Sequence, residues 1–214
     1  MTDPGVPSPL RLGETAANFT ARTTRGVVSL ADYRGRWLVF FSHPADFTPV
    51  CTSEFIAFAR AAEQFEELGC ALLGLSVDSL FSHLAWVRLI HDRFGVDIDF
   101  PIVEDPTLEI AKAYGMVAPD AVDASAVRAT LFLDPEGVLR ASTTYPAEVG
   151  RSIPEVLRTL QALQRVHGGK VLAPADWQPG ANLLREPAGH AQDVLAGDGA
   201  TDWFYTTIPD IRAR

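Results

Sequence analysis

Five consecutive large apolar residues, 37–41, stand between Gly35 and Pro44 and constrain the fold more than any other part of the chain. Such a run predicts a strand that is buried on both faces, with other elements packed on each side of its sheet. Further strands are predicted over residues 70–77, 100–103, 129–133 and 138–144, the last two as a hairpin. Helices are predicted over residues 80–94, 108–114 and 153–166. This order indicates an α/β domain with a mixed central sheet.

An apolar stripe at helical spacing follows the first strand. It predicts a helix that begins after Thr48 as N-cap, has Pro49 in its first turn and ends near Gly69. The stripe consists of Cys51, Phe55, Phe58, Ala62 and Phe65. Cys51 therefore falls in the first turn, where unsatisfied N–H groups and the helix dipole favour a thiolate over a thiol. A reactive cysteine is predicted at the carboxyl end of the strand.

The second cysteine, Cys70, opens an apolar strand and is predicted to be an inert core residue. Neither cysteine belongs to a Cys-x-x-Cys pair. Two cysteines also cannot build a disulfide framework, so the sequence argues against a structural zinc site or a dithiol redox motif.

The composition indicates a globular chain. Its 214 residues are 47% hydrophobic and 21% charged, which is enough for one substantial core and a small appendage. No apolar run approaches the ~18 residues of a membrane helix, and the N-terminus lacks the plan of a secretion signal. We therefore expect a cytoplasmic protein that does not associate with membranes. The net charge of −9 disfavours nonspecific binding of nucleic acid.

The pattern changes after residues 167–169. Residues 170–214 are rich in Pro, Gly and Ala, with one helical candidate at 187–195, and they have too little core to fold alone. We expect them to pack on the main domain or on a partner subunit through aromatic anchors. These anchors are Trp177, Trp203, Phe204 and Tyr205.

The motif Pro44-x-x-x-Thr48-x-x-Cys51 resembles the active-site signature of the peroxiredoxins (AhpC/TSA-like), and its flanking residues are similar to the long-chain 1-Cys subgroup. Other segments resemble family blocks in the family's order, at residues 75–79, 82–86, 128–137, 145–147, 150–151 and 174–180. The resemblance implies a thioredoxin-like fold with a small C-terminal dimerisation arm. The implied domains are a peroxiredoxin domain at 1–168 and a dimerisation domain at 169–214.

The resemblance also implies site roles. Cys51 would be the nucleophile that attacks a hydroperoxide and becomes a sulfenic acid. Arg128 would supply a permanent cation and Thr48 a hydroxyl that donates and accepts, while Pro44 would shield the pocket from water. His43 and Arg151 are carried over as substrate-binding residues. No cofactor and no metal are expected.

Each role has a simpler alternative. Thr48 could be only a helix cap, Arg128 could pair with a surface acid, and Arg151 could be a solvated charge at a helix start. His43 could be an ordinary turn residue. His83 and His91, eight residues apart on one helix, are interpreted as solvated rather than metal-binding.

A second thiol that could resolve the sulfenic acid is missing where the family's 2-Cys members carry it. Residues 170–214 contain no cysteine, and position 56 is Ile56. We therefore expect a 1-Cys cycle with an external thiol reductant. The chain would reduce hydrogen peroxide and organic hydroperoxides, in antioxidant defence and redox homeostasis. A homodimer is expected, with assembly into a decamer or larger ring left open. A redox sensor and a holdase chaperone of the same fold are the alternative functions.

Overall fold

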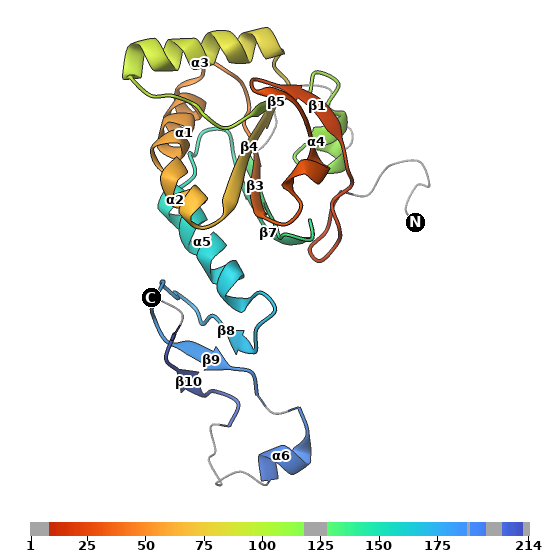
Figure 1. Ribbon diagram of the computed structural model, residues 1–214, viewed down its shortest axis with the longest axis vertical. Helices are drawn as coiled ribbons and strands as arrows, with labels where there is room; N and C mark the ends of the chain where they lie inside the picture. Colours follow the sequence, from red (N-terminus) through yellow and green to blue (C-terminus); the bar gives the residue numbers. More distant parts are fainter. Residues whose placement is uncertain (1–8, 118–127, 188, 196–202, 212–214) are drawn as a thin grey trace. The chain divides into compact units, whose positions relative to one another are not determined.

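The computed structural model describes residues 9–117, 128–187, 189–195 and 203–211 (Figure 1). The chain divides into two compact units, Met1–Ile153 and Pro154–Arg214. In the described part, no helix combines the length and the apolar character needed to cross a membrane.

The described part of the first unit contains a seven-stranded sheet with the order β2-β1-β5-β4-β3-β6-β7. Its strands are β1 (Thr20–Thr23), β2 (Gly26–Ser29), β3 (Trp37–Ser42), β4 (Cys70–Ser76), β5 (Ile102–Glu104), β6 (Arg128–Leu133) and β7 (Leu139–Tyr145). β3, β4 and β5 run parallel, whereas β6 is antiparallel to both β3 and β7. The predicted mixed central sheet and the predicted hairpin are confirmed.

The helices of the first unit lie on both sides of this sheet. They are η1 (Leu30–Tyr33), α1 (Pro49–Arg60), α2 (Ala62–Glu67), α3 (Leu80–Phe94) and α4 (Glu109–Ala113). Figure 1 shows α1 and α2 on one side and α4 on the other. The single helix expected from Pro49 to Gly69 is wrong in one respect, because it is interrupted at Ala61. The N–H of Ala61 is shared between the carbonyls of Ala57 and Phe58, a tightened turn that ends α1.

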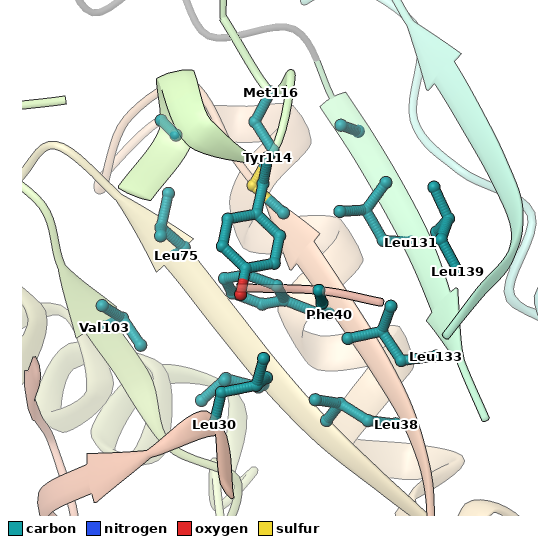
Figure 2. Packing of buried hydrophobic residues seen from close by; sticks show 14 of the residues in the cluster. Leu30, Leu38, Phe40, Leu75, Val103, Tyr114, Met116, Leu131, Leu133 and Leu139 are labelled. Atoms are coloured by element: carbon teal, nitrogen blue, oxygen red, sulfur yellow. The ribbon is translucent and has the colours of Figure 1, made fainter. Parts of the chain in front are cut away.

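The position of β3 inside the sheet, between β4 and β6, explains why its sequence is apolar. Successive side chains of a strand point to opposite faces. Phe40 belongs to a core cluster on one face, where the ring of Tyr114 meets it edge-on at 5.3 Å (Figure 2). Phe41 points to the other face, where its ring stacks on Phe58 of α1 at 4.3 Å. β3 thus contributes buried side chains to the apolar packing on each face of the sheet.

β1 and β2 were not predicted from the sequence. Their residues, TART and GVVS, carry too few apolar side chains for a buried-strand pattern. They form a hairpin at the sheet edge, where β1 also pairs with β5 through Thr23 and Val103. An edge position lets one side of a polar hairpin face water.

The second unit contains α5 (Ile153–Val166), which begins at the last residue of the first unit, and the short helix α6 (Ala191–Leu195). Its described residues also form an antiparallel sheet of β8 (Val171–Leu172), β9 (Leu183–Arg185) and β10 (Thr207–Ile208). The helix expected over 187–195 is therefore shorter than predicted.

The aromatic side chains of the second unit differ in exposure. Trp177 is buried and its indole donates to the carbonyl of Ala181 at 3.2 Å, whereas Trp203, Phe204 and Tyr205 are exposed. Their proposed role as anchors, and the domain limits 1–168 and 169–214, stay predictions.

Candidate active site

Cys51 lies in the first turn of α1, just beyond the carboxyl end of β3. It is the third residue of the helix, and the first helical hydrogen bond runs from the N–H of Thr52 to the carbonyl of Thr48. The N–H groups before Thr52 therefore have no helical acceptor, and they turn the positive end of the helix dipole toward this region. The Cys51 side chain is completely buried. A thiolate at this position has a dipole to stabilise it.

Arg128, at the start of β6, brings a cation to this sulfur. Its Nη1 lies 3.3 Å from Sγ of Cys51, and its Nε and Nη2 donate to the carbonyl of Ala147 at 3.0 and 2.6 Å. The residue is 2% exposed. The alternative of a surface pairing for Arg128 is therefore wrong, because the guanidinium is buried and lies beside the cysteine.

Glu54, one turn after Cys51 on α1, joins two arginines. Its Oε2 accepts from Nη1 of Arg128 at 2.6 Å and from Nη2 of Arg151 at 2.8 Å. Its Oε1 accepts from the backbone N–H and Nε of Arg151 at 2.7 and 2.9 Å. Burial by itself would raise the pKa of Glu54, but the hydrogen bonds and charge of Arg151, with the charge of Arg128, lower the pKa below its ordinary value. Glu54 is thus a carboxylate that offsets part of the charge of both arginines.

Arg151 contacts Glu54 and not the sulfur of Cys51 among the described contacts. Besides Glu54, it donates to the carbonyl of Ala129 at 3.1 Å, and its guanidinium lies over the ring of Phe41 at 5.0 Å. It is buried, so the solvated interpretation is wrong. Its described contacts connect it to Cys51 through Glu54 and Arg128.

Thr48 and Pro44 belong to the loop that leads from β3 into α1. Thr48 occupies the N-cap position, as predicted, but its hydroxyl forms no capping bond within the described residues. It donates instead to the carbonyl of Ala45 at 2.9 Å, which leaves its lone pairs free to accept a hydrogen bond. Pro44 is partly buried.

His43 lies inside the molecule on the same loop. Its ring is fully buried, meets the ring of Phe55 edge-on at 4.7 Å and lies 5.2 Å from the ring of Trp86. Its Nε2 is 2.9 Å from Oδ1 of Asp46. Burial lowers the pKa of His43, against the opposing effect of Asp46. The residue is therefore a packed, hydrogen-bonded imidazole and not an exposed turn residue.

Comparisons with known proteins identify the family of this chain. The model of the AhpC/TSA family matches residues 12–142. "Peroxiredoxin 2" of Picrophilus torridus is 44% identical over 201 residues, which cover 93% of this chain and 99% of that protein. The chain belongs to the peroxiredoxin family. It is a thiol-dependent peroxidase, with a peroxide as substrate and a thiol as reductant.

Solved peroxiredoxin structures share its thioredoxin-like fold. The structure of a yeast mitochondrial 1-Cys peroxiredoxin, 34% identical, aligns with a TM-score of 0.83 and covers 94% of this chain and 100% of that one. A reduced 2-Cys peroxiredoxin of Plasmodium vivax, 31% identical, aligns with a TM-score of 0.76 over 88% of this chain and 100% of that one. The expected fold class is confirmed.

Cys70 is placed far from Cys51 in this peroxiredoxin. It pairs with Trp37 at the start of β3, whereas Cys51 follows the end of that strand. A six-residue strand is roughly 20 Å long. Cys70 is 2% exposed, and burial raises the pKa of its thiol to about 12. It is a buried core residue, as predicted, and the raised pKa disfavours its thiolate. That Cys70 takes no part in the chemistry stays a prediction.

His83 corrects another expectation. It is fully buried on α3, with Nδ1 2.8 Å from Oδ2 of Asp46, so the solvated interpretation is wrong for His83. His91 is exposed and lies 2.7 Å from Asp97. Side-chain ligand atoms of His43, Asp46 and His83 lie within 4.8 Å of one another and could in principle hold a cation. Both oxygens of Asp46 already have imidazole partners.

The sequence did not lead us to Glu54 or Asp46, and it led us to interpret His83 as solvated. A signal existed for two of them. Glu54 is three residues from Cys51 and four from Phe58, so it lies on the buried stripe of α1. His83, with Trp86 and Ile90 at the same helical spacing, lies on the buried stripe of α3.

Proposed function

We propose that Cys51 is the peroxidatic nucleophile of a 1-Cys peroxiredoxin that reduces hydrogen peroxide and organic hydroperoxides. The buried guanidinium of Arg128, with Nη1 3.3 Å from Sγ of Cys51, supports this proposal most directly. A fixed cation with several donors favours the thiolate and can also stabilise charge that develops on a departing oxygen.

In the reaction, the Cys51 thiolate attacks one peroxide oxygen and the O–O bond breaks. The sulfur becomes a sulfenic acid, and the second oxygen leaves as water or an alcohol after it gains a proton. Arg128 and the free N–H groups of the first turn of α1 would stabilise the developing anion. Thr48 would accept a hydrogen bond from the peroxide O–H while it donates to the carbonyl of Ala45, and Pro44 would exclude water. His43 and Arg151 would shape the substrate pocket.

The 1-Cys cycle is supported by the position of Cys70. A disulfide requires Cα atoms within about 7 Å of each other. Cys70 lies beside the start of β3, whereas Cys51 lies in α1, beyond the other end of β3. An external thiol would therefore attack the sulfenic acid, forming a mixed disulfide and releasing water. A second thiol would then restore the Cys51 thiol and release the external disulfide.

The wider role follows from this chemistry. We propose antioxidant defence and redox homeostasis in the cytoplasm, carried out by a homodimer in which residues 169–214 form the arm between subunits. The exposed side chains of Trp203, Phe204 and Tyr205 support such an arm. Measurement of the molecular mass in solution distinguishes a dimer from a decamer or larger ring of dimers.

Intact-mass spectrometry after one equivalent of hydrogen peroxide tests the proposal. A gain of one oxygen is expected in the wild type and in Cys70→Ser, and no gain is expected in Cys51→Ser. A loss of two hydrogens would indicate an intramolecular disulfide and contradict the 1-Cys cycle. Slow turnover with a stable mixed disulfide would favour a redox sensor, and aggregation protection that survives Cys51→Ser would favour a holdase.

A further inference from the structure

Three buried side chains form a hydrogen-bonded chain beside the loop that carries the active-site motif. Asp46 lies at its centre, with Oδ1 2.9 Å from Nε2 of His43 and Oδ2 2.8 Å from Nδ1 of His83. Both imidazoles are completely buried, and the Asp46 side chain is 1% exposed. A buried carboxylate is stable only when donors replace its lost water.

The partners of each ring nitrogen determine where the hydrogens lie. His83 faces oxygen acceptors on both sides, because its Nε2 is 3.3 Å from the carbonyl of Val103. Donation to both acceptors would require hydrogen on both nitrogens of His83. His43 donates from Nε2 to Asp46, so its Nδ1 keeps a lone pair. This Nδ1 is buried and has no hydrogen-bond partner among the described residues.

This placement of hydrogens on His43 and His83 would leave no net charge on the buried group of three side chains. A positive charge on His83 would match the negative charge of Asp46, while His43 stays neutral. Burial would raise the pKa of Asp46, yet the hydrogen bonds and charges of His43 and His83 lower it to about 2. Burial, with the charges of His83 and Arg151, opposes a second positive charge on His43 and lowers its pKa.

Asp46 also holds the backbone of the loop that leads from β3 into α1. The N–H of Asp46 donates to Oδ2 of Asp78 at 2.9 Å, and the hydroxyl of Ser76 donates to the same oxygen at 3.0 Å. The next residue, Phe47, has a φ of 58°, a left-handed conformation that a bulky side chain seldom adopts without outside support. Thr48 follows directly, and then the first turn of α1 with Cys51. Asp46 therefore ties the motif loop to α3 and to the end of β4.

We propose that Asp46 and His83 are positioning residues: they hold His43 as the Nε2–H tautomer and fix the loop from His43 to Thr48 in the geometry that peroxide reduction by Cys51 requires. This inference rests on the proposed function. A buried carboxylate that accepts a hydrogen bond from one imidazole nitrogen orients the ring and leaves the other nitrogen unprotonated. Neither residue contacts the sulfur in the described structure.

The test combines Asp46→Asn with nitrogen-15 NMR of the imidazole rings. The side-chain amide of this variant would offer one acceptor and one donor, so one imidazole would have to accept rather than donate. We expect the rate of Cys51 oxidation by hydrogen peroxide to fall by about ten-fold or more, at a temperature where the variant is fully folded. The matched control is Asp97→Asn, which removes the exposed partner of His91 next to the same helix, and its rate should equal that of the wild type.

In the wild type, NMR should find His43 protonated only at Nε2 and His83 protonated at both nitrogens. His43 protonated at Nδ1, or an Asp46→Asn rate within two-fold of the wild type, would overturn the inference. If Asp46→Asn does not fold, the rate is measured in His83→Gln with the same expectation, and the NMR result needs no variant. Failure of the proposed function is separate, because the wild type would then show no oxidation of Cys51 while its ring signals could still be read.

Discussion

Glu54 and Arg128 are buried together, with 2.6 Å between Oε2 of the carboxylate and Nη1 of the guanidinium. The same nitrogen lies 3.3 Å from the sulfur of Cys51. The carboxylate therefore orients the cation and reduces its effective charge at the same time. A second arginine, Arg151, holds both oxygens of Glu54 and keeps the carboxylate in place.

Glu54→Gln should lower both stability and activity. A neutral amide would direct N–H groups toward one of two buried arginines and leave their charges uncompensated. Removal of one partner from a buried ion pair costs about 3 kcal/mol or more in the free energy of unfolding. Denaturant unfolding measures this loss, and stopped-flow oxidation of Cys51 should be at least about ten-fold slower at 25 °C. Unchanged oxidation in a folded variant would contradict the positioning role of Glu54.

Arg128→Lys and Arg151→Lys should differ in their effects. Lysine keeps the charge but loses the planar fork that allows Arg128 to donate to Cys51, Glu54 and Ala147 together. Arg151 donates to Glu54 and not to the sulfur, so its replacement should cost about 2 kcal/mol of stability. The rate of peroxide reduction should fall more in Arg128→Lys than in Arg151→Lys. Equal rates in both variants would refute direct assistance by Arg128.

Cys70→Ala should leave peroxide reduction unchanged. With a pKa of about 12, only on the order of one in ten thousand Cys70 thiols is ionised at pH 8. The variant should lose about 1–2 kcal/mol of stability, because a small buried side chain is truncated. Turnover with an external dithiol is the measurement. Alanine is preferred to serine here, since a buried hydroxyl would add a cost of its own.

The protein should lose stability as the pH falls. The pKa of His43 is lower in the folded state, so the chain gains a proton more readily when unfolded and stability declines below pH ~6.5. The pKa of Glu54 is also lowered, and its contribution is lost below pH ~4.5. Asp46, with a folded pKa of about 2, contributes about 2 kcal/mol that disappears between pH ~4 and 2.

Urea unfolding across this pH range provides the measurement. His43→Gln should flatten the profile between pH 6.5 and 5 and leave the decline below pH 4.5 in place. Identical profiles of the wild type and His43→Gln between pH 7 and 5 would contradict the buried neutral state of His43.

Several elements could be predicted because their signals are local. Each of these signals lies within one segment of chain: the apolar run of β3, the helical periodicity over the 15 residues of α3, and the turn between β6 and β7. Local signals were insufficient for the polar edge hairpin β1–β2, for the break at Ala61 and for the hydroxyl of Thr48, which bonds to Ala45 instead of capping α1. These features depend on hydrogen bonds that neighbouring elements make available.

The α/β class, the placement of Cys51 at the start of a helix and the lack of a thiol in residues 170–214 follow from the amino-acid sequence alone. The residues that surround Cys51 could be found only in the folded protein. Arg128 is 77 positions from Cys51 and Arg151 is 97 positions from Glu54, yet all four side chains meet in one buried cluster. The reason is physical: helical and strand periodicity act over a few residues, whereas a buried charge must find partners wherever the fold brings them.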